Sequence, residues 1–292
     1  MQTLGYVLMH EHMKIDLSRI KQNPDCCLDC FEETKREMQQ LYKHGVRKIW
    51  DVTAMGMGRN LSFIERLEQE SGMQIMMSTG WYKEPYLPAS LHHLSVEEMA
   101  DIMIGELEEG IDSSSRRAQA IGEIGTSKDH WTACEQKVFD AAIMAHKKTG
   151  RPIYTHTTLG TFGLQQAVYF KEKQCDVKRI VIGHMDLCES FDTLVSILET
   201  GVTIGFDTIG KTEYATDEQR VSFLMRLEAL GYIGQVVLSM DITRTSQLTV
   251  NGGIGYSYLF TTFLPMLKAA GMKPESIEQL LITNPHQLLQ LD

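Results

Sequence analysis

Two histidines one residue apart stand near the start of the chain, in the run Met9-His10-Glu11-His12-Met13. They follow residues 4–8, a short apolar and β-branched run that predicts a strand. Because side chains alternate between the two faces of a strand, His10 and His12 should point the same way and Glu11 the other. Two imidazoles on one face at a strand end can bind one metal ion. The spacing differs from the helical H-E-x-x-H motif of metalloproteases, whose histidines are four residues apart.

Similar metal-binding side chains recur at the ends of later predicted strands. They are Glu123, His156, His184 and Asp241. Any one of them alone is also consistent with a buried polar residue of the core. Six such residues at strand ends are harder to explain in that way, because burying an unpaired polar group costs free energy. Four imidazoles and two carboxylates instead match a pair of divalent metal ions with nitrogen and oxygen ligands.

Alternating strand and helix patterns predict how these side chains are positioned. The predicted strands are 4–8, 46–53, 74–80, 118–125, 152–156, 179–184, 202–207 and 235–241. Eight strand–helix units indicate a parallel sheet, and eight strands can close into an α/β fold of the (β/α)8 or TIM-barrel type. The carboxyl ends of the strands would then meet at one mouth, which would contain the metal site. A doubly wound open sheet is the alternative, although no G-x-G-x-x-G or P-loop motif follows an early strand.

Composition narrows the classes of function. The chain has 292 residues and a formal net charge of -10 without runs of like charge, which argues against nucleic-acid binding and against an anionic membrane surface. We see no domain boundary and predict a single domain over residues 1–292. No signal-peptide pattern or apolar run of membrane-spanning length is visible, so we expect a cytoplasmic protein with reduced cysteines. Cys27-Leu28-Asp29-Cys30 is a C-x-x-C motif, but no second pair follows it to form a zinc ribbon.

The run Gly5-Tyr6-Val7-Leu8-Met9-His10-Glu11-His12 resembles the opening signature of the phosphotriesterase-related proteins of the amidohydrolase superfamily. The resemblance extends over nearly the whole chain and is greatest to the subgroup of phosphotriesterase homology proteins. The runs that carry it further are 123–127, 155–157, 182–186, 206–210, 239–244 and 283–285. It implies a binuclear metal-dependent hydrolase that acts on an ester bond of a small molecule, and it leaves a homodimer open.

The resemblance also implies a role for each donor. The two ions would be bound by His10, His12 and Asp241 on one side and by His156 and His184 on the other. Many family members bridge the two metals with a carboxylated lysine, but the predicted strand 118–125 contains Glu123 and no lysine. Glu123 would therefore be the bridge, as in the homology-protein subgroup. This difference puts activity on paraoxon-like triesters in doubt.

A binuclear centre suggests a mechanism. Two metals can lower the pKa of a shared water and polarise the substrate oxygen, and Asp241 would accept the proton and pass it to the leaving group. Zinc fits these ligands, and manganese or cobalt would also fit. Asp186, two residues after His184, is as consistent with a salt bridge or a helix cap as with an outer partner of the site.

Two cations follow the last two predicted strands, where TIM barrels often bind phosphate. We predict that Lys211 and Arg244 bind an anionic substrate group, as in similar enzymes that hydrolyse phosphorylated sugar lactones. Surface salt bridges are an equally good interpretation of both residues. Trp81 and Tyr82, after the third predicted strand, either line the mouth or pack under a loop, and packing is favoured.

Two other classes of protein share part of the pattern. TatD-type metal-dependent nucleases also use an H-x-H motif, a glutamate in the fourth strand, two later histidines and a final aspartate. The motif around His10 and the run 239–244 resemble the phosphotriesterase group more closely, and the acidic charge disfavours nucleic acid. A non-catalytic metal-binding barrel protein would be expected to have lost some ligands, whereas all six are present here.

Overall fold

Eight parallel strands form the centre of the computed structural model, which describes residues 4–290. In sheet order they are β1 (Tyr6–Glu11), β4 (Val46–Asp51), β5 (Gln74–Thr79), β6 (Ala120–Thr126), β7 (Ile153–Thr157), β8 (Ile180–Ile182), β9 (Thr203–Phe206) and β10 (Val236–Leu238). The order follows the chain, which confirms the (β/α)8 barrel and excludes a doubly wound sheet. The predicted single domain also includes residues 1–3 and 291–292, which lie outside the described residues.

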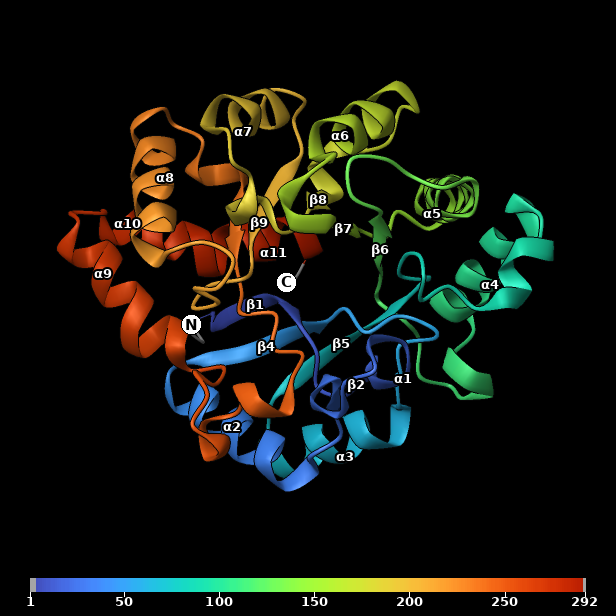
Figure 1. Ribbon diagram of the computed structural model, residues 1–292, viewed down its shortest axis with the longest axis horizontal. Coiled ribbons are helices and arrows are strands. Elements are labelled where there is room, and N and C mark those ends of the chain that lie inside the picture. Colours follow the sequence, from blue (N-terminus) through green and yellow to red (C-terminus); the bar gives the residue numbers. More distant parts are fainter. Residues whose placement is uncertain (1–3, 291–292) are drawn as a thin grey trace.

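Helices surround the strands (Figure 1). They are α1 (Ser18–Lys21), α2 (Phe31–Lys43), α3 (Leu61–Ser71), α4 (Val96–Glu108), α5 (Ala133–Thr149), α6 (Gly163–Glu172), α7 (Phe191–Leu198), α8 (Asp217–Ala229), α9 (Leu264–Ala269), α10 (Pro274–Glu278) and α11 (Asn284–Leu289). Short antiparallel strands β2 (Ile15–Asp16) and β3 (Cys27–Leu28) lie outside the barrel. Helix α4 begins with the expected capping box, in which Ser95 and Glu98 exchange hydrogen bonds. In the described residues no helix is both long and apolar enough to cross a membrane.

Two apolar layers hold the barrel together. The larger layer lies between the strands and the surrounding helices, and includes Leu8, Ile49 and Ile124. A second cluster includes Val7 and Met9 of β1 together with Trp50, Met76, Tyr154, Val181 and Val237 of other strands. Leu288 and Leu289 of α11 belong to this second cluster. The C-terminal helix therefore packs against the interior of the barrel, which leaves the opposite mouth for a functional site.

Side chains complete the seam between β1 and β10. The backbone N–H of Asp241 donates to the carbonyl of His10 at 3.2 Å, and the backbone N–H of His10 donates to the Ser239 hydroxyl at 2.9 Å. The buried carboxylate of Glu11 accepts hydrogen bonds from the Ser239 hydroxyl and the Met240 N–H, both at 2.8 Å. Glu11 thus points away from the two histidines, as the strand alternation predicts, and joins the first strand to the last.

Candidate active site

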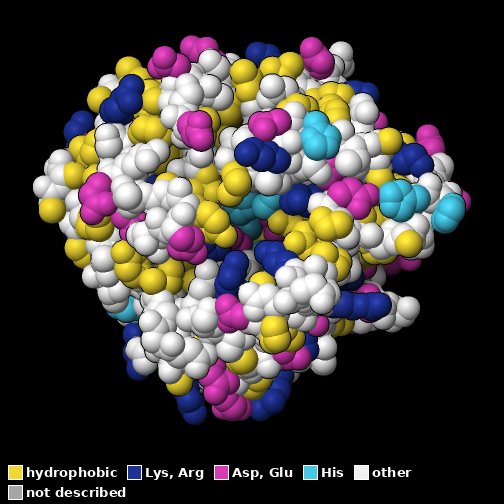
Figure 2. Space-filling model, viewed as in Figure 1, with side chains coloured by type: hydrophobic (Ala, Val, Ile, Leu, Met, Phe, Trp, Pro, Cys, Tyr) yellow, Lys and Arg dark blue, Asp and Glu magenta, His cyan; other side chains and the backbone are white. Residues whose placement is uncertain are grey.

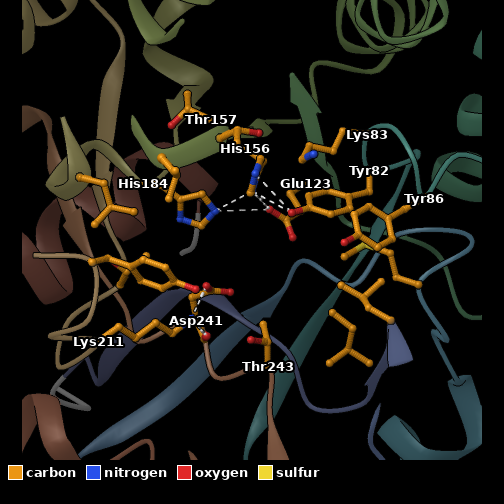
Figure 3. Close-up of a pocket in the computed structure, with 18 of the residues that line it drawn as sticks. Tyr82, Lys83, Tyr86, Glu123, His156, Thr157, His184, Lys211, Asp241 and Thr243 are labelled. Carbon is orange, nitrogen blue, oxygen red and sulfur yellow. Dashed lines mark hydrogen bonds and ion pairs between the residues drawn. The ribbon is translucent and has the colours of Figure 1, made fainter. Parts of the chain in front are cut away.

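The six predicted donors meet at the mouth of the barrel, although they come from five different strand ends. Nε2 of His12 lies 3.4 Å from Oε1 of Glu123 and 3.3 Å from Oδ1 of Asp241. Nε2 of His10 lies 3.6 Å from Oε2 of Glu123 and 3.5 Å from Oδ1 of Asp241. Nδ1 of His156 lies 3.2 Å from Oε2 of Glu123 and 2.8 Å from Nε2 of His184. Figure 3 shows Glu123 facing His156 and His184, with Asp241 across the pocket from them.

A cavity of about 200 Å³ opens over this cluster. Figure 2 shows a hollow near the middle of this face, with histidine side chains inside it and Lys or Arg side chains at its edge. The residues that line the cavity include the cations Lys21, Lys83, Lys211 and Arg244, whereas its only carboxylates among the described residues are Glu123 and Asp241. The acidic protein therefore has a local excess of positive side chains around the site.

Bulges in two strands turn the donors inward. Along β1, Leu8 is paired with Ile49 of β4 and Glu11 with Asp51, so three steps on one strand oppose two on the other. The extra residue reverses the alternation set by Val7 and Met9, and brings His10 and His12 into the barrel. Without this bulge, the two histidines would share the outward face of Leu8.

Strand β6 has the same irregularity. Ile121 is paired with Ile153 of β7, whereas Ile124 is paired with Thr155, so one extra residue lies between them. Ile121 and Ile124 both pack outward against the helices, and Glu123 points inward. Gly122 makes this possible, since its φ is +111° and a Cβ atom there would lie 2.0 Å from the carbonyl oxygen of Tyr154. Gly122 was not predicted as part of the site, and its glycine in the middle of a strand was the available signal.

The donor set has the chemistry expected of a metal centre. Two overlapping groups, which share His10, have ligand atoms within 4.8 Å of one another and could hold an ion: His10, His12 and Asp241, and His10, Glu123 and His184. Nε2 of His10 and Nε2 of His12 are buried and have no hydrogen-bond partner in residues 4–290. Buried imidazole nitrogens without a partner are costly, and a coordinated cation would remove that cost. The residues therefore fit a metal.

Asp207 is a buried partner of the cluster that the sequence did not predict. This fully buried aspartate follows β9, and its Oδ1 lies 2.7 Å from Nδ1 of His184. It also accepts a hydrogen bond from the His184 backbone N–H at 3.0 Å. If Nδ1 of His184 donates to this carboxylate, Nε2 is left as an acceptor facing the cluster. The position directly after a strand was the available signal for Asp207.

His12 has an outer partner of the same kind. Its Nδ1 lies 2.8 Å from the hydroxyl of Thr53, which follows β4. Thr53 is positioned in turn by Asp51, whose carboxylate accepts a hydrogen bond from the Thr53 N–H at 2.8 Å. Nε2 of His12 is therefore the nitrogen that faces the two carboxylates. Neither Asp51 nor Thr53 was predicted.

Electrostatic interactions keep the two carboxylates of the cluster ionised. Burial by itself raises the pKa of Asp241, but the ammonium of Lys211 and the imidazoles of His10 and His12 hold that pKa well below its ordinary value. Burial is likewise outweighed at Glu123, where the surrounding histidines hold the pKa well below its ordinary value. Both groups are thus acceptors at neutral pH.

The pKa values of two histidines in the cluster shift in opposite directions. Burial lowers the pKa of His12, but Asp241 and Glu123 outweigh it and raise the value to about 10. At His156, burial and the neighbouring His184 lower the pKa to about 4. Without a cation the cluster therefore retains protons on some imidazoles, and metal binding must displace them.

Lys211 and Arg244 both line the cavity, and each also forms an ion pair, which was the alternative interpretation. Lys211 is buried, and its ammonium donates to the backbone carbonyl and to the carboxylate of Asp241. Arg244 is partly exposed, and its guanidinium is 4.0 Å from the carboxylate of Asp25. Lys211 is thus bound to one of the proposed metal ligands, whereas Arg244 has only a loose ion pair.

Asp186 forms a buried salt bridge, one of its three predicted roles. Its Oδ2 accepts a hydrogen bond from Nε of Arg220 at 2.7 Å and one from the Thr208 hydroxyl at 2.5 Å. It also accepts from the backbone N–H of Asp207 at 3.3 Å, and so touches the residue that positions His184. Asp186 therefore supports the site through Asp207 and has no direct hydrogen bond to His184 among the described contacts.

The two aromatic residues after β5 separate into different roles. Trp81 is buried in the apolar layer and does not line the cavity, as expected for packing under a loop. Tyr82 lines the cavity, and its hydroxyl is 3.2 Å from Nδ1 of His156. Tyr82 also belongs to the apolar layer, so it combines the preferred packing role with a place at the mouth.

The fold and the site together place a candidate metal centre at the mouth of a (β/α)8 barrel, and comparisons with known proteins give the family. The family model "Phosphotriesterase family" matches residues 1–289. The chain belongs to this family, which confirms the resemblance seen in the sequence.

Three relatives show the range of the family. The chain is 42% identical over 286 residues to the phosphotriesterase homology protein of Escherichia coli (strain K12), with 98% of each chain covered. A crystal structure of the E. coli protein, complexed with phosphate in its active site, superposes with a TM-score of 0.97 over 99% of this chain and 100% of that one. An aryldialkylphosphatase of Saccharolobus solfataricus is 29% identical, with 97% of this chain and 94% of the relative covered. An N-acetyltaurine hydrolase of Dictyostelium discoideum is also 29% identical, with 90% and 74% covered.

Proposed function

We propose that this protein is a binuclear-metal hydrolase that cleaves an ester of a small anionic molecule, such as a phosphorylated sugar lactone. The observation that carries this proposal is the set of four imidazoles and two carboxylates at the mouth, in which buried ring nitrogens of His10 and His12 lack partners among the described residues. His10, His12 and Asp241 would hold one ion, His156 and His184 the other, and Glu123 would bridge them. Zinc is the metal that we favour, with manganese or cobalt as alternatives.

A metal pair held by these residues would supply Lewis-acid chemistry, by lowering the pKa of water and polarising the oxygen of the scissile bond. Asp241 then has the role of proton acceptor and passes the proton toward the leaving group. Lys211 holds the pKa of Asp241 below its ordinary value, so the carboxylate is ionised at neutral pH and free to accept a proton. Lys211 would also keep Asp241 oriented, through its bonds to both the carboxylate and the backbone carbonyl of that residue.

An anionic substrate is supported by the charge around the cavity. Arg244 offers a planar guanidinium at the edge of the mouth, and its only carboxylate neighbour within 4.0 Å in residues 4–290 is Asp25. The relative from E. coli binds phosphate in its active site, which agrees with an anionic group here. We propose that Arg244 binds this group from the edge and Lys211 from the floor of the cavity.

The first experiment counts the metal ions bound to the purified protein by mass spectrometry and screens hydrolysis. The screen covers lactones with and without a phosphate, a phosphotriester, an N-acetyl amide and single-stranded DNA. Two ions per chain with turnover of phosphorylated lactones support the proposal. Cleavage of DNA alone would favour the nuclease alternative. Less than one tightly bound ion, not restored by adding zinc or manganese, would contradict the metal centre.

Arg244→Met then tests the substrate class. We expect it to raise KM for a phosphorylated lactone by about tenfold, with little change for the uncharged lactone, because one charge-assisted contact to the anion is lost. Arg19→Met is the matched control, since Arg19 is exposed on α1 and does not line the cavity. Equal effects of Arg244→Met on both lactones would refute the anion-binding role.

A further inference from the structure

A second cavity lies at the other end of the barrel. Its volume is about 540 Å³, and it is lined by His146, Lys147, Thr149, Gly150, Arg151, Asp176, Arg179 and Gln290. These residues come from the end of α5, from the segments that lead into β7 and β8, and from the end of α11. His156 lies near the opposite end of β7 and His184 just beyond the opposite end of β8, so this cavity is separate from the candidate metal centre.

A buried arginine lines the cavity without a partner. Arg179 is only 8% exposed, yet its Nε atom has no hydrogen-bond partner in residues 4–290. No carboxylate in that range lies within 4.0 Å of its guanidinium. A buried Nε–H without an acceptor is costly, and burial lowers the pKa of Arg179. An acceptor from outside the described residues would remove that cost.

The other groups of the cavity also favour an anion. Lys147 and Arg151 are exposed cations at its edge, so that three cations stand against the single carboxylate of Asp176. That carboxylate already accepts from the backbone N–H of Lys178 at 3.3 Å. His146 is fully engaged, because its Nδ1 lies 2.7 Å from the Arg151 carbonyl and its Nε2 accepts from the Asp176 N–H at 3.2 Å. Arg179 is thus the floor of a positively charged cavity.

We propose that this cavity binds a phosphate group, with Arg179 as its principal ligand and Arg151 and Lys147 at its edge. The planar guanidinium of arginine matches two phosphate oxygens, and the exposed cations can contact the remaining ones. The group is either inorganic phosphate or the phosphate of a small monoester, and both offer the same oxygens to Arg179. This site is independent of the proposed reaction at the mouth.

Isothermal titration calorimetry of the full-length, metal-loaded protein tests the proposal. Inorganic phosphate and glycerol phosphate are titrated separately into the wild type and into Arg179→Met. We expect Arg179→Met either to bind one phosphate fewer per chain than the wild type or to bind that phosphate about tenfold more weakly. Phosphate bound at the active-site mouth would be the same in both proteins. Tighter binding of glycerol phosphate would identify a monoester as the ligand, and tighter binding of inorganic phosphate would identify the free ion. If the active-site mouth binds no phosphate, the difference between the wild type and Arg179→Met remains. Failure of the proposed function is therefore distinguishable from failure of this proposal.

Arg117→Met is the matched control. Arg117 is exposed three residues before β6, at the same end of the barrel, and does not line the cavity. The Arg117→Met substitution removes the same charge as Arg179→Met and should change the affinity for phosphate less than twofold. Arg151→Met alters an exposed position and should weaken binding about threefold without affecting folding, which circular dichroism checks.

Three results would overturn the proposal. The first is unchanged phosphate binding in a folded Arg179→Met protein. The second is an equal loss in Arg117→Met, which would show that only the net charge matters. The third is binding that is seen only after Leu291 and Asp292 are deleted, which would mean that the intact chain does not offer this site to phosphate.

Discussion

Oδ1 of Asp207 lies 2.7 Å from Nδ1 of His184, and the same carboxylate accepts the backbone N–H of that histidine. Two contacts to one carboxylate fix both the ring and the main chain of His184, whose φ is +57°. Tyr154 completes the arrangement, because its hydroxyl donates to Oδ2 of Asp207 at 2.7 Å. Asp207 thus fixes the orientation of His184, and its Oδ2 also lies 3.6 Å from Nδ1 of His10.

Asp207→Asn should weaken metal binding. The asparagine amide carries no charge, and it can turn its NH2 group toward Nδ1 of His184. Either way His184 loses its carboxylate partner, and loss of such a partner lowers metal affinity by about 10–100-fold. Competition with a chromophoric chelator measures the affinity of each ion. Asp101→Asn, at an exposed position of α4, is the control. Unchanged affinity of both ions in Asp207→Asn would show that Asp207 has no positioning role.

Gly122→Ala should destabilise the barrel at the bulge of β6. The new Cβ would lie 2.0 Å from the carbonyl oxygen of Tyr154, so the backbone must move, and we expect a loss of about 3 kcal/mol in the free energy of unfolding. Gly150→Ala is a matched control, because Gly150 also has a positive φ (+68°) but has open space around it. Its expected cost is about 1 kcal/mol.

Urea unfolding of the two alanine variants separates close packing from backbone strain. A larger loss for Gly122→Ala, together with lower metal content, would show that the bulge aims Glu123. Equal losses in the two proteins would mean that only the positive φ matters.

Glu11→Ala should open the seam between the first and last strands. It leaves the Ser239 hydroxyl and the Met240 N–H without their acceptor and creates a small cavity, so we expect a loss of about 3–5 kcal/mol. Thermal unfolding measures the loss, and Glu278→Ala on the exposed face of α10 serves as the reference. A melting temperature of Glu11→Ala equal to that of the reference would be incompatible with a structural role for Glu11.

Arg220→Met should also be destabilising, although Arg220 does not line the cavity. This fully buried arginine pairs with Asp186 at 2.7 Å and with Asp217 at 2.8 Å. Removing it leaves two buried carboxylates without a counter-charge, which costs about 3–5 kcal/mol. Arg226→Met lies on the same helix at an exposed position and should cost about 1 kcal/mol or less, from its contact with Phe191. Similar unfolding midpoints for the two variants would contradict the buried network.

The sequence by itself determined the order of the strands and which six side chains are candidate metal ligands. Each predicted strand is a short apolar run bounded by turn residues, and the helices between them are amphipathic. In a parallel barrel the ends of consecutive strands must meet, so residues such as His10, His156 and Asp241 could be placed at one mouth without coordinates. The apolar runs, the turn residues between them and the polar side chains at strand ends are local features, so a single sequence is enough to identify them.

Only the tertiary structure decided which residues support these donors and how each donor is aimed. Asp207 and Thr53 contact His184 and His12 from the ends of neighbouring strands, and no spacing along the chain records such a contact. The bulges at His10 and at Glu123 are irregularities in pairing with a neighbouring strand, so strict alternation cannot reveal them. Arg179 likewise looks like an ordinary surface residue in the sequence. Its lack of a partner among the described residues emerges only when its neighbours in space are known.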